Sequence, residues 1–109
     1  MTPFEFAHRI AVVESNNNPN APLGDDGRAL GRFQVHPDWL FDWSTNYHIT
    51  PHLMETWDSF VIRVVEAFYQ SHTTMMDVEI AMYFHLGHPC KSTDSDWDKD
   101  YAERFTTAS

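Results

Sequence analysis

Basic residues are scarce in this chain, and their scarcity excludes one large class of function. The 109 residues include 7 lysines and arginines against 16 aspartates and glutamates, for a formal net charge of −9. Proteins that bind nucleic acids use a basic surface to neutralise phosphates. We therefore expect no nucleic-acid partner. The acidic charge also disfavours long-range attraction to anionic polymers.

Cysteines and long apolar runs are also scarce. The single cysteine, Cys90, rules out a disulfide within the chain, and no catalytic Cys–His signature surrounds it. Every apolar stretch is much shorter than the roughly 20 residues that cross a bilayer. The first residues lack the basic and apolar regions of a signal peptide. We expect a protein that is made in the cytoplasm and does not insert into membranes, so that any work on the cell wall requires delivery by another factor.

Histidines are frequent, but their spacing does not indicate a metal centre. The seven histidines are scattered, and only His85 and His88 stand three residues apart near the end of a predicted helix. Zinc sites in proteins show closely spaced pairs of Cys or His ligands, and no such set occurs here. We expect neither a metal ion nor a cofactor.

Apolar residues recur at helical spacing along most of the chain, which predicts a mainly α fold. Hydrophobic residues make up 42% and aromatic residues 15% of the sequence, as in a globular protein, and we expect one domain over residues 1–109. The first predicted helix runs from Pro3 to Glu14 or Ser15 and is capped by Thr2, and a short helix follows Pro37. The main core helix is predicted to start at Thr50–Pro51 and to carry Leu53 to Phe68. The next helix is capped by Thr74 and ended by Gly87, and the last is capped by Asp94 or Ser95 and carries Trp97, Tyr101 and Phe105.

The segment after the first helix breaks the helical pattern. Residues 16–22 contain four asparagines and two prolines, and Gly24, Gly27 and Gly31 follow in short extended pieces. We therefore expect a helical bundle with a small irregular or β-ribbon insert after its first helix.

Glu14 and two aspartates in the insert form a candidate catalytic group. Glu14 lies at a helix C-terminus beside an apolar face, and both burial and the helix dipole favour a protonated carboxyl that can act as an acid. Asp25 and Asp26 follow eleven and twelve residues later on a turn between glycines. Two carboxylates on opposite sides of a gap are what glycosidic bond cleavage requires. A solvated glutamate and ordinary turn aspartates explain the same residues equally well.

Several segments of this sequence resemble motifs of a known family. "ES" at 14–15 followed by "GDDGRALGRFQV" at 24–35 resembles the active-site region of the lysozyme-like superfamily, that is, goose-type lysozymes and soluble lytic transglycosylases. "NPNA" at 18–21 and "AMYFHLG" at 81–87 stand where related motifs occur, and "DYAERF" at 100–105 resembles the family's last helix. The matching residues in the insert are Gly24, Asp25, Gly27, Gly31, Gln34 and Val35.

This resemblance implies an α+β lysozyme-like fold in which the insert forms one wall of a substrate cleft. It also implies a glycosidase that cleaves the β-1,4 bond between N-acetylmuramic acid and N-acetylglucosamine in peptidoglycan. Glu14 would be the general acid, and Asp25 would position a water, with Asp26 as the alternative. Without a working second carboxylate, the C6 hydroxyl of the sugar would attack instead, as in lytic transglycosylases.

The resemblance further implies a set of substrate-binding residues. Ser15 and Gln34 would hydrogen-bond the substrate or steady the site, and Tyr83 or His85 would hold Glu14 and line the cleft. The chain departs from the family pattern at His36, where goose-type lysozymes have an aspartate, and at Phe84 in the "AMYFHLG" segment, where the family motif has a tyrosine. His36 could still bind or polarise a water.

The expected partners are the glycan strands of peptidoglycan, together with a larger virion or secretion assembly. A phage particle, a holin or a secretion system would deliver the protein to the wall. Two alternatives stay open at this point. One is an inactive relative that serves as a glycan-binding or structural module, and the other is a chitinase-type hydrolase.

Overall fold

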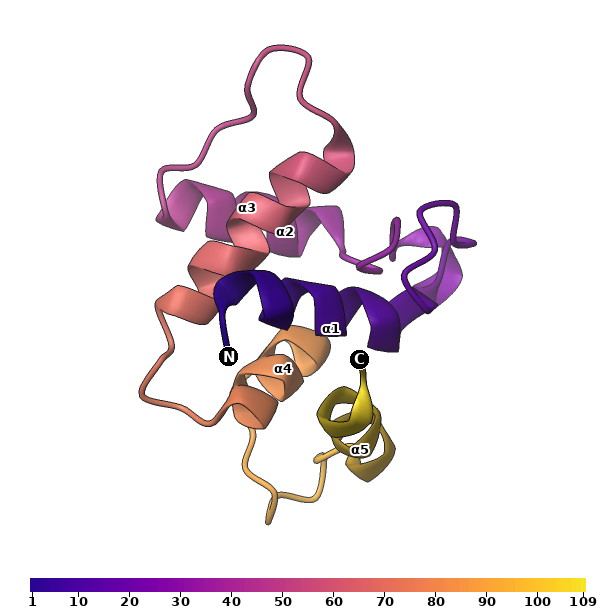
Figure 1. Ribbon diagram of the computed structural model, residues 1–109, viewed down its shortest axis with the longest axis vertical. Coiled ribbons are helices and arrows are strands. Elements are labelled where there is room, and N and C mark those ends of the chain that lie inside the picture. The colour runs from indigo at the N-terminus through magenta and orange to yellow at the C-terminus, as the bar shows by residue number, and fades with distance from the viewer.

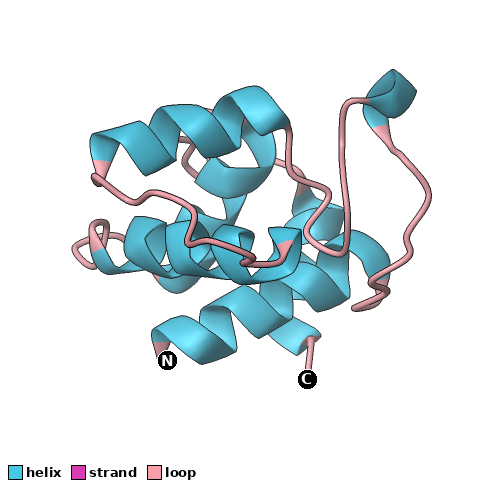
Figure 2. Cartoon of the chain, turned by 90° about the horizontal axis from the view of Figure 1, so that it is seen from above, coloured by secondary structure: helices cyan, strands magenta, loops and turns pink.

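Five α-helices make up most of the protein. The computed structural model describes all residues from 1 to 109, and its helices are α1 (Pro3–Ser15), α2 (Pro37–Asn46), α3 (Trp57–Gln70), α4 (Asp77–Leu86) and α5 (Lys99–Thr107). The mainly α prediction is confirmed. Residues 16–36 contain a single 3-10 turn, η1 (Asp25–Gly27), and two isolated antiparallel bridges, Gly24 with Ala29 and Leu30 with Val35, rather than strands. Figure 2 accordingly shows helices and loops alone.

Helix α1 occupies the middle of the molecule. In Figure 1 it crosses the centre, with α2 and α3 above it and α4 and α5 below it. It packs against α3 and α5, while α2 packs on α3 and α4 on α5. Thr2 caps α1 by accepting a hydrogen bond from the amide of Glu5 at 3.0 Å, as the sequence predicts.

The hydrophobic core is a continuous cluster of 21 buried residues drawn from all five helices. Phe6 on α1 is fully buried, and its ring stacks on Tyr69 of α3 at 4.6 Å between centroids. Phe105 of α5 meets the Phe6 ring edge-on, with centroids 5.7 Å apart. Phe6 therefore joins α1 to the two helices that it packs against.

The predicted start of the main core helix is wrong. Helix α3 begins at Trp57, because Thr56 caps it by accepting from the amide of Ser59 at 3.1 Å. The segment from Thr50 to Glu55 forms a loop, in which the carboxylate of Glu55 accepts a hydrogen bond from the amide of His52 at 2.9 Å. The same carboxylate pairs with Arg63 at 2.7 Å, which fixes the loop to the helix.

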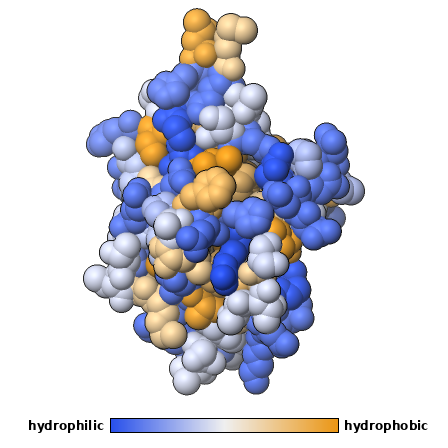
Figure 3. Space-filling view, viewed as in Figure 1, coloured by the Kyte–Doolittle hydropathy of each residue, from blue (hydrophilic) through white to orange (hydrophobic).

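This loop carries an apolar tip that points into solvent. Leu53 is 95% exposed and Met54 is 93% exposed, whereas the sequence pattern placed Leu53 on a buried stripe. In Figure 3 the uppermost part of the molecule is apolar, and in Figure 1 the same place is the loop between α2 and α3.

None of the five helices is long and apolar enough to cross a lipid bilayer.

Two further helix starts differ from the predictions. Met76, not Thr74, precedes α4, and the carboxylate of Glu79 accepts from its amide at 3.1 Å. Gly87 ends α4 in the left-handed conformation at φ 81°, as predicted. Asp98, not Asp94 or Ser95, caps α5 by accepting from the amide of Tyr101 at 3.0 Å, so Trp97 lies before the helix. The position of Asp98 brings its carboxylate next to the C-terminal end of α4.

Candidate active site

An open pocket of about 360 Å³ lies between the C-terminal ends of α1 and α4 on one side and residues 25–39 on the other. It collects five of the residues singled out from the sequence and leaves out Ser15, Asp26 and Tyr83. The residues that line it are Glu14, Asp25, Ala29, Gln34, Val35, His36, Asp38, Trp39, Phe84, His85, Leu86 and Gly87. The C-terminal ends of α1 and α4 form one wall of the pocket, which we call the helical wall. Residues 25–36 form the other, which we call the loop wall, and Asp38 and Trp39 of α2 follow it directly in the chain.

Glu14 stands on the helical wall at the last turn of α1. Its side chain is 14% exposed, and its Oε2 lies 3.5 Å from Nδ1 of His85 on α4. Helix α1 ends directly after it, because Asn16 adopts the left-handed conformation at φ 56°. The carboxyl group is therefore mostly shielded from water and faces the pocket from a rigid element.

His85 lies between two carboxylates. Its Nδ1 faces Glu14, and its Nε2 is 3.3 Å from Oδ2 of Asp98. Burial alone would lower the pKa of His85, but the hydrogen bonds and charges of Glu14 and Asp98 outweigh burial, so the pKa is raised above its usual value. The imidazole is therefore held in an environment that favours its protonated form.

Tyr101 supports this arrangement from α5. Its ring stacks on His85, with centroids 3.8 Å apart and planes 11° from parallel. Its hydroxyl is buried and makes no hydrogen bond of acceptable geometry. Burial first, and the neighbouring Glu14 carboxylate second, raise the pKa of Tyr101 well above its usual range. Sequence reasoning gave neither Tyr101 nor Asp98 a role, although the "DYAERF" match pointed to the helix that carries Tyr101.

Asp25 stands on the loop wall and is much more exposed than Glu14. Its Oδ2 lies 2.7 Å from Nε2 of His36, and the two side chains are 65% and 40% exposed. The hydrogen bond from His36 lowers the pKa of Asp25 below its usual value. The loop wall therefore presents an ionised carboxylate next to an imidazole, both open to water.

Gln34 lines the pocket, but its side-chain amide hydrogen-bonds the backbone of the loop itself. Its Nε2 donates to the carbonyl oxygens of Gly31 at 2.9 Å and Pro22 at 3.2 Å. Its backbone adopts a positive φ of 48°, which is uncommon outside glycine. A Cβ added to Gly24 would come within 2.4 Å of the Gln34 Oε1, so the loop requires glycine there unless Gln34 moves. Of the two roles expected for Gln34, these contacts match the steadying one.

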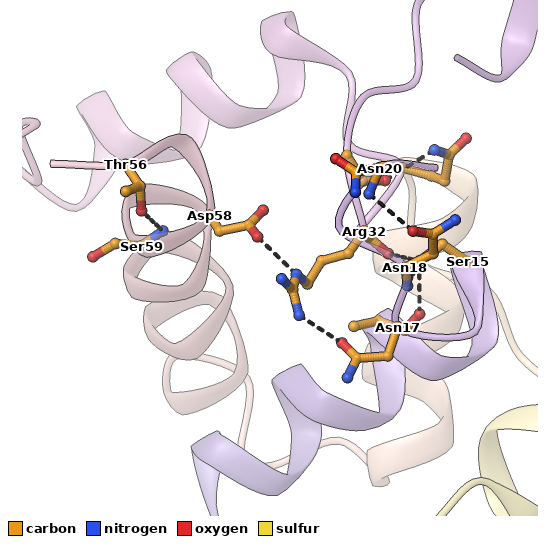
Figure 4. Close-up of polar contacts among 11 residues, drawn as sticks. Ser15, Asn17, Asn18, Asn20, Arg32, Thr56, Asp58 and Ser59 are labelled. Carbon is orange, nitrogen blue, oxygen red and sulfur yellow. Dashed lines mark hydrogen bonds and ion pairs between the residues drawn. The ribbon is translucent and has the colours of Figure 1, made fainter. Parts of the chain in front are cut away.

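Ser15 is not among the residues that line the pocket, and its hydroxyl joins the helical wall to the loop wall. Its hydroxyl donates to the carbonyl of Arg32 at 2.6 Å and accepts from the amide of Asn18 at 3.1 Å. The side chain of Arg32 then reaches Asp58 on α3 at 2.7 Å and Asn17 at 3.0 Å, as Figure 4 shows. The insert is thus fastened to α1 and to α3 at the same point.

Tyr83 and Asp26 lie away from the pocket. Tyr83 packs its ring against Phe68 and His72, at 5.1 and 5.2 Å between centroids. It therefore cannot hold Glu14 as expected, and its neighbour Phe84 lines the pocket instead. Asp26 is exposed on η1 at φ 57° and is not among the residues that line the pocket, so Asp25 is the aspartate of the pair that shares the pocket with Glu14.

One cluster elsewhere combines groups of the kind that bind metals. Cys90, Asp94 and Asp96 each offer an atom within 4.8 Å of the others, in the loop between α4 and α5. The thiol donates to Asp96 at 3.2 Å, and the carboxylates raise the pKa of Cys90, after burial, to about 11. These residues face one another and not the pocket, and we assign no metal ion to them.

Comparison of the chain with protein-family models, with curated proteins and with solved structures finds no match. The choice of function therefore depends on the chemistry of the pocket and on the motifs in the sequence.

Proposed function

We propose that this protein is a glycosidase that cleaves the β-1,4 bond between N-acetylmuramic acid and N-acetylglucosamine in peptidoglycan. One observation carries the proposal. A mostly buried carboxyl group, Glu14, and an exposed carboxylate, Asp25, line opposite walls of a single open pocket. Two carboxyl groups in unlike environments on the two sides of a scissile bond are the usual requirement for glycoside hydrolysis.

Glu14 acts as the general acid in this proposal. It gives a proton to the glycosidic oxygen as the bond to the anomeric carbon breaks, and its carboxyl group reaches the pocket from the last turn of a packed helix. The cleavage leaves positive charge on the sugar ring. A carboxylate on the loop wall stabilises that charge from the other side.

Asp25 and His36 act on the attacking group. In a hydrolase, Asp25 orients a water, and His36 accepts its proton or holds Asp25 in place. In a lytic transglycosylase, the C6 hydroxyl of the muramic acid residue attacks instead and gives a 1,6-anhydro sugar. The pocket is compatible with both outcomes, and the products distinguish them.

The lining of the pocket supports a sugar as substrate. Trp39 and Phe84 supply ring surfaces, which meet edge-on at 4.9 Å, and polar groups surround them. Apolar faces with a few convergent polar groups are typical of small-molecule sites. The choice of peptidoglycan over chitin comes from the motif resemblance, as does delivery to the wall by a phage particle, a holin or a secretion system.

The decisive experiment is mass spectrometry of purified peptidoglycan after digestion by the wild type and by Glu14→Gln. We expect soluble muropeptides from the wild type, and a rate lower by roughly 10²- to 10⁴-fold for Glu14→Gln, because the proton donor is lost while the shape of the side chain is kept. Reducing ends identify a hydrolase, and 1,6-anhydro ends identify a lytic transglycosylase. Asp25→Asn then slows a hydrolase more than a transglycosylase, because only the hydrolase also needs Asp25 to orient a water.

Glu5→Gln is the matched control, because Glu5 is an exposed glutamate on the same helix, away from the pocket. It should digest peptidoglycan at the wild-type rate. Chitin oligomers in place of peptidoglycan test the chitinase alternative. Full activity in Glu14→Gln would contradict the proposal, and binding of glycan strands without any products would favour the inactive module.

A further inference from the structure

The helical wall contains an arrangement that the proposed reaction leaves unused. His85 lies between Glu14 and Asp98, so each of its ring nitrogens faces a carboxylate, at 3.5 and 3.3 Å. A neutral imidazole has one N–H and can donate to one of them, whereas an imidazolium can donate to both. The pair of carboxylates therefore favours a proton on His85.

Other features of the fold favour the same charge. His85 lies in the last turn of α4, where the helix dipole stabilises a cation. Tyr101 covers one face of its ring and keeps it in place, with 29% of the His85 side chain exposed. On α5, Arg104 lies with its guanidinium 5.7 Å from the centroid of the Tyr101 ring, and Asp25 lines the same pocket as His85. The charged groups in this part of the molecule are thus Glu14 and Asp98 in contact with the imidazole, together with Asp25 and Arg104.

We propose that His85, held by Asp98, is a positioning residue that supplies the proton with which Glu14 acts as an acid. The inference rests on the proposed function and deepens it. With one proton between them, His85 and Glu14 form either an ion pair or a neutral pair. A sugar that fills the pocket excludes water and favours the neutral pair, because burial disfavours the charged forms of both groups.

The proton balance closes over one turnover. Nδ1 of His85 gives its proton to Oε2 of Glu14, while Nε2–H stays directed at Asp98. Glu14 then passes this proton to the glycosidic oxygen as the carbon–oxygen bond breaks. The attacking water or hydroxyl group releases one proton to solvent, and Nδ1 of His85 takes one up from solvent. Neither an oxidant nor a metal ion takes part.

This role makes the upper pH limit of the reaction follow the titration of His85. Above the pKa of His85 the pair holds no proton, and cleavage stops. Since the Asp98 carboxylate favours the imidazolium, Asp98→Asn should lower the pKa of His85 by about one pH unit and move the alkaline limb of kcat/KM by the same amount. Asparagine still caps α5, so the helix is retained.

The test combines two measurements on the full-length protein. The titration of His85 is followed by NMR of its ring nitrogens, assigned with His85→Asn, and kcat/KM for peptidoglycan digestion is measured from pH 4 to pH 9. We expect coincident shifts in Asp98→Asn and none in Asp100→Asn. Asp100 is the matched control because it is an exposed aspartate on α5 that pairs with Arg104 and not with His85.

His85→Asn should cleave near pH 4.5 but lose roughly a hundredfold of that rate at pH 6.5, because the group that supplies the proton to Glu14 is then absent. An unchanged pH profile in His85→Asn would overturn this inference and leave the proposed glycosidase intact. A wild type that cleaves no peptidoglycan at any pH would instead refute the proposed function, and the role of His85 with it.

Discussion

The two walls of the pocket carry the same pair of groups in opposite settings. On the helical wall, Glu14 and His85 are 14% and 29% exposed and stand at the ends of packed helices. On the loop wall, Asp25 and His36 are 65% and 40% exposed, and Asp25 lies on backbone at positive φ. The comparison teaches that one pocket can present the same two kinds of side chain in settings that differ in burial and in structural support.

The walls also differ in what holds them. The helical wall is supported by the hydrophobic core, because Phe6 of α1 and Ile80 and Met82 of α4 are all fully buried. The loop wall reaches the core only through Phe33 and Val35, and it is otherwise held by hydrogen bonds made by Ser15, Gln34 and Arg32. Regions held by few apolar contacts open more readily than the core. We therefore expect the loop wall to be the more mobile side of the pocket.

The largest expected effect breaks the support of the helical wall. Phe6→Ala should lower the free energy of unfolding by about 3–5 kcal/mol, because it removes a ring that joins α1, α3 and α5 and leaves a cavity. Chemical denaturation followed by circular dichroism measures the change. Phe4→Ala is the control on the same helix, since Phe4 is 70% exposed, and its effect should stay within about 0.5 kcal/mol. Equal losses for the two would mean that α1 is not anchored as described.

A smaller effect should come from the link between the walls. Ser15→Ala removes the hydroxyl that donates to the Arg32 carbonyl and accepts from the Asn18 amide, so we expect a loss of about 1–3 kcal/mol. Amide hydrogen exchange should become faster in residues 16–36 and stay unchanged in α3. Faster exchange throughout the protein would show that the insert is not a separately opening unit.

The smallest effect concerns the exposed pair. The pKa of Asp25 is lowered by its hydrogen bond with His36, so the contribution of the pair is present at neutral pH and is lost as the pH falls through the lowered pKa. His36→Gln should raise the midpoint of Asp25, measured by NMR of its carboxyl carbon, toward the ordinary value. We expect no measurable change in unfolding at pH 7, because both groups are exposed. No change in the Asp25 midpoint would contradict the pairing.

The local signals in the sequence predicted the mainly α fold and part of the pocket lining. The helical spacing of apolar residues places α1, Pro37 marks the start of α2, and the Asn- and Pro-rich segment marks where α1 ends. The cap of α3 was missed because Thr50 and Thr56 are both good caps, and the ion pair between Glu55 and Arg63 decides between them. That pair links a loop to a later helix, which no local pattern reveals.

The same limit applies to the site. Glu14, Asp25 and Gln34 lie close enough in sequence for spacing to suggest a shared site, and they do line one pocket. Asp98 and Tyr101 reach the site only because α5 packs on α1 and α4. Tyr83 was placed wrongly because α4 has buried apolar residues on several sides, Ile80, Ala81, Met82 and Phe84, so its pattern does not tell which residue faces the pocket.

The apolar tip of the loop before α3 has a chemical consequence of its own. Methionine oxidation to the sulfoxide follows exposure of the thioether. Met54 is 93% exposed and Met76 is 67% exposed, whereas Met82 is fully buried in the core. An oxidant therefore meets Met54 first, at the end of the molecule farthest from α5 in Figure 1, and the added oxygen makes the tip polar without disturbing the packing of the helices.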